Sequence, residues 1–253
     1  MGAGHGHSLH FHGHSPIHRL PAHVKLTTLV LFVLIVVATP RTAVPAFGAY
    51  VALLLAVAAF TTVPWTSLAR RMVVEVPFVV FALLMPFVAE GPRVRVGPLH
   101  LAEAGLWGAW GLLAKGTLGV LASLIFGTTT EPRDIVRALE KLRLPQPIVQ
   151  IASFMFRYLE VVTGELRRMK IARDSRGFQA RSIRQWRVLA GTLGALFIRS
   201  YERGERVHLA MLSRGYAGRL PFARQLTATW GDWGRALTLP VAGIGILAAV
   251  MFA

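Results

Sequence analysis

Two copies of one short motif are the residues of this chain best suited to bind a partner. The copies read Ser175-Arg176-Gly177-Phe178 and Ser213-Arg214-Gly215-Tyr216, and their arginines are 38 positions apart. An arginine in the last turn of a helix complements the negative end of the helix dipole, and a following glycine accepts the left-handed conformation that ends the helix. Such an end would present the arginine rigidly at the surface. The duplicated motif therefore predicts a duplicated partner.

Helix capping alone would also explain a single Arg-Gly pair. The residues that lead into the two copies match as well, which favours a duplicated device over two unrelated caps. The aligned positions pair Arg168 with Arg206, Met169 with Val207, Ile171 with Leu209 and Ala172 with Ala210. Capping and docking are compatible, so both interpretations stay open for each copy.

Signatures of catalysis are missing from the sequence. There is no phosphate loop of the Gly-x-x-x-x-Gly-Lys-Ser/Thr type, no Gly-x-Ser-x-Gly elbow and no His-Glu-x-x-His helix. The chain has no cysteine, which excludes disulfides and thiolate metal sites. We therefore expect a protein that is not an enzyme and that does not hydrolyse ATP by itself.

A histidine-rich tail is the candidate metal site. It contains His5, His7, His10, His12, His14 and His18. Neutral imidazole binds nickel, cobalt, copper and zinc, and a flexible tail could gather several rings around one ion. The tail predicts weak binding of Co²⁺ or Ni²⁺, with an incidental affinity of a polar segment as the alternative. We expect no cofactor elsewhere, and interpret His100 and His208 as ordinary polar residues.

The composition places the chain among membrane proteins. Of the 253 residues, 54% are apolar, and the formal net charge is +16. Residues 131–235 hold 20 lysines and arginines against 9 aspartates and glutamates. Such a basic stretch beside apolar segments is typical of a cytoplasmic region near anionic lipid. No recognised nucleic-acid motif accompanies the charge, so we expect a lipid bilayer rather than nucleic acid as the partner.

Apolar runs predict five membrane spans and a basic helical module. The runs cover about 26–39, 44–60, 73–89, 104–126 and 236–252. Some are shorter than the ~20 residues that cross a bilayer, so tilting or burial would have to compensate. The predicted organisation is a tail over 1–25, four spans within 26–128, a module over 129–235 and a last span over 236–253. The fold class is therefore an all-α polytopic membrane protein.

Lys115 is the most unusual residue of the predicted spans, because a cation is costly in hydrocarbon. It lies at four-residue spacing with Gly111, Gly119, Ser123 and Gly127. This small-residue seam predicts close approach of a neighbouring helix and places Lys115 against protein. A lysine paired or snorkelling inside the bundle is one interpretation, and a direct role in transport is the other.

The basic module is predicted to contain long amphipathic helices. A first helix begins near Glu131 and ends near Leu144, and two longer ones cover about 148–173 and 183–212. The longer helices mix apolar residues at helical spacing with many charges, which is typical of helices along or beneath a membrane. Glu202 and Arg206 are predicted to pair at i,i+4.

This arrangement resembles the transmembrane (T) component of energy-coupling factor transporters, in its cobalt/nickel branch called CbiQ. The resemblance covers nearly the whole chain: N-terminal spans, a helical module with Arg-centred motifs and a final span. The usual Ala-Arg-Gly motif of that family is matched by Ser175-Arg176-Gly177 and Ser213-Arg214-Gly215. Relatives often carry Leu-Asp-Pro-Arg-x-Lys before the first span. This chain reads Leu20-Pro21-Ala22-His23-Val24-Lys25, and no role is transferred to these positions.

The resemblance implies a scaffold in the plasma or inner membrane. Two ABC-type ATPase subunits would dock on Arg176 and Arg214, one on each, and a substrate-capture (S) membrane protein would bind the same scaffold. Movement of the ATPases would pass through the module and tilt the capture protein. The tail and the module would be cytoplasmic, and the cargo would be cobalt or nickel, in the service of cobalamin biosynthesis, or alternatively a vitamin.

Two other function classes remain open. A self-contained secondary transporter should show paired repeats among its spans, whereas the repeat here lies in the basic module. A membrane-embedded enzyme should show clustered acids, bases or metal ligands within spans, and only Lys115 and Glu75 come near this description.

Overall fold

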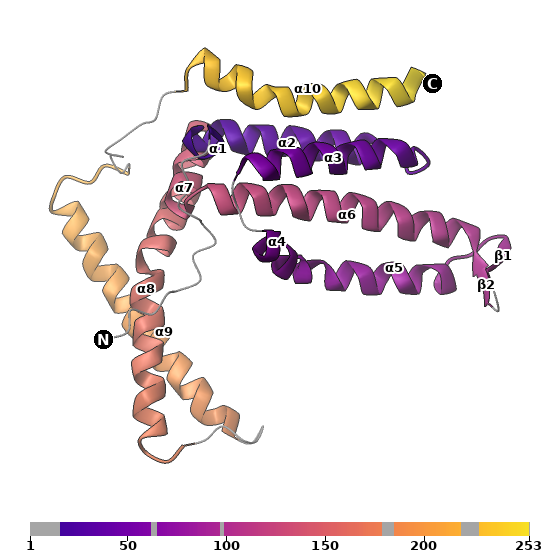
Figure 1. The fold of residues 1–253 in the computed structure, drawn as a ribbon. Coiled ribbons are helices and arrows are strands. Elements are labelled where there is room, and N and C mark those ends of the chain that lie inside the picture. The colour runs from indigo at the N-terminus through magenta and orange to yellow at the C-terminus, as the bar shows by residue number, and fades with distance from the viewer. Residues whose placement is uncertain (1–15, 62–64, 97–98, 179–184, 219–227, 253) are drawn as a thin grey trace. The chain divides into compact units, whose positions relative to one another are not determined.

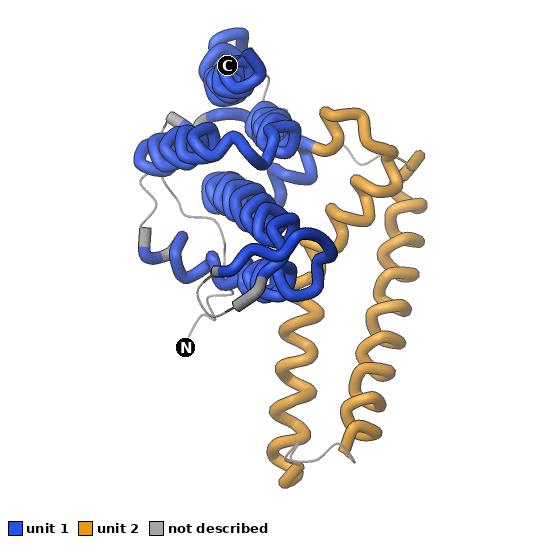
Figure 2. Tube along the Cα trace, turned by 90° about the vertical axis from the view of Figure 1, so that its right-hand side faces the viewer, with its two compact units in different colours: residues 1–138, 226–253 blue, residues 139–225 orange. Residues whose placement is uncertain are grey.

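The structure is a computed structural model that describes residues 16–61, 65–96, 99–178, 185–218 and 228–252, and these are mostly helical. The chain divides into two compact units (Figure 2): residues 1–138 with 226–253, and residues 139–225. The second unit begins and ends ten residues inside the module that we expected over 129–235.

Unit 1 is a bundle of apolar helices that lie side by side (Figure 1). Its long members are α2 (Ala22–Ala38), α3 (Val44–Phe60), α5 (Val76–Val88), α6 (Glu103–Thr129) and α10 (Trp230–Phe252). The shorter elements are α1 (Pro16–Arg19), α4 (Trp65–Arg71) and the 3₁₀ turn η1 (Met72–Glu75). Between α5 and α6, strand β1 (Arg93–Val96) pairs with β2 (Leu99–Ala102) in an antiparallel hairpin.

Three of the five predicted spans are long and apolar enough to cross a membrane: Leu68–Val88, Glu103–Thr129 and Trp230–Phe252. The helices α2 and α3 are apolar but have 17 residues each. At 1.5 Å of rise per residue they measure about 25 Å, somewhat less than the ~30 Å of a hydrocarbon core. The all-α polytopic fold class is confirmed.

The core of unit 1 is centred on Tyr50, which is fully buried. Its hydroxyl lies 3.1 Å from Thr39 Oγ1 and 3.3 Å from the carbonyl oxygen of Gly243, which links α3 to the end of α2 and to α10. Phe32 and Phe47 meet the Tyr50 ring edge-on. The ring of such a buried tyrosine fills the core, while its hydroxyl keeps the hydrogen bonds that a buried polar group needs.

The small-residue seam predicted on α6 is wrong for most of its length. A Cβ atom at Gly119 or Gly127 would meet nothing within 4 Å, and Ser123 is exposed. The close approach is at Gly105 instead, where a Cβ would lie 2.7 Å from the Met85 carbonyl oxygen of α5. Spacing of small residues identifies a face of a helix but not the level at which a neighbour crosses it.

Unit 2 contains the long helices α8 (Gln146–Asp174) and α9 (Trp186–Leu212), whose bounds lie within three residues of the predicted ones. The helix α7 (Pro132–Lys141) crosses the boundary between the two units. The helices α8 and α9 run antiparallel, and the segment 179–184 that joins them is not among the described residues. Many of their large apolar side chains are exposed, including Ile151, Phe197 and Ile198.

Candidate docking site

The first copy of the duplicated motif closes α8 with two backbone hydrogen bonds. The Phe178 N–H donates to the Arg173 carbonyl oxygen at 3.1 Å, and the Gly177 N–H donates to that of Asp174 at 3.0 Å. Gly177 has a φ of +76°, which favours glycine. These are the bonds of a Schellman cap. Arg176, directly before the glycine, is exposed.

The second copy closes α9 in the same way. The Tyr216 N–H donates to the Met211 carbonyl oxygen and the Gly215 N–H to that of Leu212, both at 3.0 Å. Gly215 has a φ of +80°, and Arg214 is exposed. The serines of the two copies also behave alike, because each hydroxyl donates to the carbonyl oxygen three residues earlier at 3.0 Å; these serines are Ser175 and Ser213. Capping is therefore confirmed for both copies, and docking stays a prediction.

The first cap is fastened to the beginning of α9 through Arg173. Its Nη1 donates to Thr192 Oγ1 at 2.8 Å, and its guanidinium carbon lies 5.9 Å from the centroid of the Phe178 ring. The aromatic residue of the motif thus packs under a cation from the last turn of its own helix. This contact holds the end of α8 against the neighbouring helix.

The second cap is fastened to the beginning of α8 through Gln150. The Tyr216 hydroxyl donates to Gln150 Oε1 at 2.5 Å, and the Gln150 side-chain amide donates to the Gly218 carbonyl oxygen. One amide side chain therefore holds both the aromatic residue of the motif and the backbone that follows it. Gln150 lies 66 residues before Tyr216, so this contact closes the helix pair at its other end.

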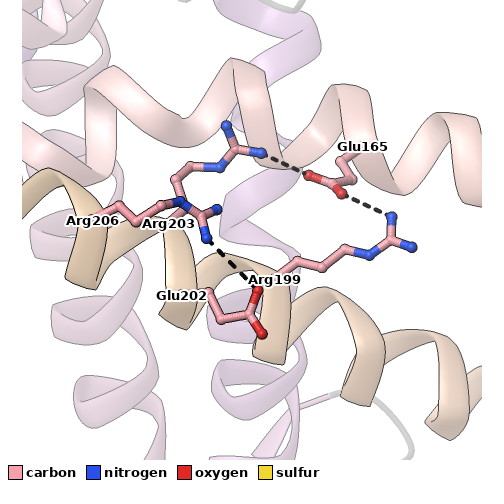
Figure 3. A network of polar contacts seen from close by, with 5 residues as sticks. All are labelled: Glu165, Arg199, Glu202, Arg203 and Arg206. Atoms are coloured by element: carbon pink, nitrogen blue, oxygen red, sulfur yellow. Dashed lines mark hydrogen bonds and ion pairs between the residues drawn. The ribbon is translucent and has the colours of Figure 1, made fainter.

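A carboxylate joins the middle of the two helices (Figure 3). Glu165 of α8 accepts from Arg199 at 3.1 Å and from Arg203 at 3.2 Å, both on α9. The hydrogen bond from Arg199 holds the pKa of Glu165 below its usual range, and the charges of Arg203, Arg199 and Arg168 act in the same direction. On α9 itself, the predicted pair of Arg206 with Glu202 is present at 3.9 Å.

The antiparallel pairing places the two caps at opposite ends of unit 2. Arg173, beside the first cap, contacts Thr192, whereas the second cap follows Leu212 at the far end of the same helix. At 1.5 Å per residue, the stretch from Thr192 to Ser213 rises about 30 Å. Two exposed arginines so far apart cannot enter one small groove, but they can each enter one of two.

Lys115, which we predicted to be an intramembrane cation, contacts protein, as one of the two sequence interpretations predicted. Its Nζ donates to the Val37 carbonyl oxygen in the last turn of α2 at 2.7 Å. A helix C-terminus carries partial negative charge, so it is a suitable partner for an ammonium. Glu75, which is buried, accepts instead from the Thr117 hydroxyl. Lys115 and Glu75 are not paired with one another in these contacts.

The predicted metal-binding tail falls largely outside the described residues. His5, His7, His10, His12 and His14 lie in the segment 1–15, and only His18 of the six is described. Its backbone carbonyl oxygen accepts from Lys25. Within the described ranges, no group of three or more histidines and carboxylates could hold a metal ion. Weak Co²⁺ or Ni²⁺ binding by the tail therefore stays a prediction.

Sequence reasoning missed the side chains that hold the two caps in place. Gln150, Thr192 and Glu165 are ordinary polar residues at ordinary helical positions. The available signal was the difference between Phe178 and Tyr216 in otherwise matching motifs, because a tyrosine hydroxyl near a helix end usually has a hydrogen-bond partner.

Comparisons with known proteins agree with this architecture. A sequence profile of the CbiQ family, described as cobalt transport protein, matches residues 13–224. The energy-coupling factor transporter transmembrane protein EcfT of Bacillus subtilis is 26% identical, over 95% of this chain and 94% of the relative. The EcfT protein of Listeria innocua is 25% identical, over 81% and 82%.

A third relative carries the name of the family itself. The cobalt transport protein CbiQ of Rhodobacter capsulatus is 26% identical, over 70% of this chain and 72% of the relative. The family profile covers most of the chain, including both arginine motifs and four of the five apolar helices. The chain therefore belongs to the CbiQ family of cobalt transport proteins and is a membrane-embedded T component of an energy-coupling factor transporter.

Proposed function

We propose that the chain is the scaffold on which two ATPase subunits dock, one on Arg176 and one on Arg214, and that it transmits their movement to a substrate-capture membrane protein that delivers cobalt or nickel. The observation that carries the proposal is the pair of matching caps at opposite ends of one antiparallel helix pair. Each cap presents an exposed arginine at a fixed place, and a guanidinium forms directional, charge-assisted bonds with carboxylates.

The helix pair has the features that such a transmitter needs. It is joined at both ends and in the middle, by Arg173 with Thr192, by Gln150 with Tyr216, and by Glu165 with two arginines. Movement at one cap would therefore displace both helices. The exposed apolar side chains of α8 and α9 supply a surface for the capture protein. The basic charge of 131–235 supports a cytoplasmic orientation.

The test is co-purification of the ATPase subunits with charge-reversal variants. Truncating a desolvated interfacial charge typically costs ~2–5 kcal/mol, and reversing it adds repulsion. Each single change, Arg176→Glu or Arg214→Glu, should weaken the complex and uncouple hydrolysis from uptake. The double change should abolish assembly, because it removes both halves of a bivalent attachment.

The matched control reverses two arginines on the same helices that are not part of either Ser-Arg-Gly motif. Arg167 of α8 and Arg187 of α9 are both exposed, and the double change Arg167→Glu with Arg187→Glu alters the net charge equally. This control should retain both ATPases. If the folded, membrane-inserted double cap variant retains them at wild-type stoichiometry, the arginines serve only as helix caps. Uptake by the chain without any ATPase would instead favour a secondary transporter.

A further inference from the structure

A cavity of about 370 Å³ lies inside unit 1, bordered by α2, α3, α6 and α10. Its lining residues come from the beginnings of α2 and α10 and from the ends of α3 and α6, so it lies at that end of the bundle. The rings of His23 and Trp233, whose centroids lie 6.2 Å apart, place the first turns of α2 and α10 together at this end. The depth of the cavity is apolar, with walls that include Phe32, Leu53 and Ile125.

Two cations are the charged side chains that line this cavity, Lys25 and Arg235. Lys25 has an exposed fraction of 9%, and its Nζ donates to the carbonyl oxygens of Thr129 at 2.8 Å and of His18 at 3.3 Å. Arg235 is exposed in the second turn of α10. Among the described residues, neither cation forms an ion pair with a carboxylate.

The apolar walls and the two cations at the rim together fit one kind of occupant. An apolar cavity of this size gains free energy when hydrocarbon replaces water, and it falls in the range of small-molecule sites. A free inorganic anion would leave the apolar walls unfilled. An uncharged hydrocarbon would leave both cations at the rim without an ion-pair partner. Asp134 and Asp232 are the acids whose charges act on Lys25 and Arg235, and they form no ion pair with them among the described residues. A molecule with an alkyl chain and a negatively charged head satisfies both parts.

We propose that this cavity binds one acyl chain of an anionic phospholipid, with the lipid phosphate between Lys25 and Arg235. This polypeptide is a membrane protein, so phospholipid is present around it at high local concentration. The carbonyl oxygens that hold the Lys25 ammonium fix its position at the rim, and Arg235 is free of ion pairs within the described part and can turn toward the phosphate. The site joins α10 to α2 and α6 through a lipid.

The experiment measures lipids that stay bound to the purified full-length chain by native mass spectrometry. The chain is offered phosphatidylglycerol, phosphatidylcholine with the same acyl chains, or glycerol 1-phosphate. Phosphatidylglycerol should be retained roughly tenfold or more over phosphatidylcholine, since one basic side chain near a lipid surface contributes a factor of about five. Glycerol 1-phosphate should not be retained, because it has no chain to fill the cavity.

Two matched pairs of variants separate the cavity from its charged rim. Ala56 and Ala59 are both exposed positions of α3, but only Ala56 lines the cavity, so Ala56→Phe should occupy it and Ala59→Phe should not. Ala56→Phe should reduce retention of both lipids, and Ala59→Phe should not. Arg235→Gln should lower the preference for phosphatidylglycerol about fivefold. Arg70→Gln removes an exposed arginine of α4 outside the cavity and should leave the preference unchanged.

Three results would overturn the proposal. Equal retention of the two lipids would show that the cavity binds acyl chains without recognising the lipid headgroup. Retention of glycerol 1-phosphate would show an anion site without a chain. Unchanged retention in a folded Ala56→Phe variant would show that the lipid binds elsewhere. If Ala56→Phe does not fold, Arg235→Gln still decides, since an unchanged preference for phosphatidylglycerol in that variant would show that the headgroup does not bind at the rim.

Discussion

The two arginine caps share one backbone geometry and differ in what holds them. Both end a helix with the same pair of hydrogen bonds and a left-handed glycine. The first packs its phenylalanine under the cation of Arg173, whereas the second ties its tyrosine hydroxyl to Gln150. The Ser-Arg-Gly part therefore sets how the arginine is presented. The aromatic residue that follows depends on the neighbour at that end of the helix pair.

The contacts also show that each cap is fastened by the opposite helix. The first cap, on α8, is held through Thr192 of α9, and the second cap, on α9, is held through Gln150 of α8. Neither arginine can move far without displacing both helices. If the shared backbone matters most, changes to the glycines should affect both caps equally. If the separate contacts matter, changes to the aromatic residues should affect one cap only.

The largest effect is expected from replacing the cap glycines. A Cβ at Gly177 or Gly215 would meet nothing within 4 Å, so the cost of alanine is purely conformational. An L-residue in the left-handed region costs about 1–2 kcal/mol. Gly177→Ala and Gly215→Ala should each speed amide hydrogen exchange at their own cap, by roughly 5- to 30-fold, as measured by mass spectrometry.

Gly204 in the middle of α9 provides the control, because a Cβ there also meets nothing within 4 Å but the backbone is helical. The same change, Gly204→Ala, should slow exchange in α9, since alanine in a helix interior is favoured over glycine by about 0.5–1 kcal/mol. If Gly177→Ala and Gly215→Ala changed the exchange rates by different factors, the two caps would differ in backbone strain although they share the same hydrogen bonds.

A smaller effect is expected when the second cap is made like the first. Tyr216→Phe removes the hydroxyl that Gln150 accepts from, and a typical hydrogen bond contributes about 0.5–1.5 kcal/mol. Exchange should quicken at the second cap by roughly 2- to 10-fold and stay unchanged at the first. The reverse change, Phe178→Tyr, should leave both caps as they are. An equal response of both caps to Tyr216→Phe would mean that Gln150 does not position the second one.

The amino-acid sequence was sufficient for the helices and the caps because both depend on local patterns. Apolar runs end at Pro40 and near Phe60, and Gly177 and Gly215 follow basic helices, so each boundary has its own residue signal. The hairpin of β1 and β2 was not predicted, although alternation of arginine and valine over 93–96 is a strand pattern.

Contacts between distant helices could not be predicted in the same way. Gln150 meets Tyr216 across 66 positions, and Lys25 meets Thr129 across 104. The prediction of a small-residue seam on α6 was wrong for the same reason, because glycine spacing does not tell whether α5 crosses α6 at Gly105 or farther along. Which residues share a level is decided by packing of whole helices.

The smallest effect on amide exchange is expected from Glu165→Gln, which removes the carboxylate that joins the two helices. Arg199, by its hydrogen bond, and the charges of Arg203 and Arg168 hold the pKa of Glu165 below its usual value. A carboxylate whose pKa is lowered by folding contributes stability that is complete above its unfolded pKa and is lost as the pH falls through the folded pKa. Exchange of amides where α8 meets α9 should therefore show no Glu165-dependent change between pH 8 and pH 6. It should quicken, relative to Glu165→Gln, only below about pH 4.3, the ordinary pKa of glutamate. If wild type and Glu165→Gln respond to acid identically, the bridge does not join the helices, and the two caps are held by their own contacts alone.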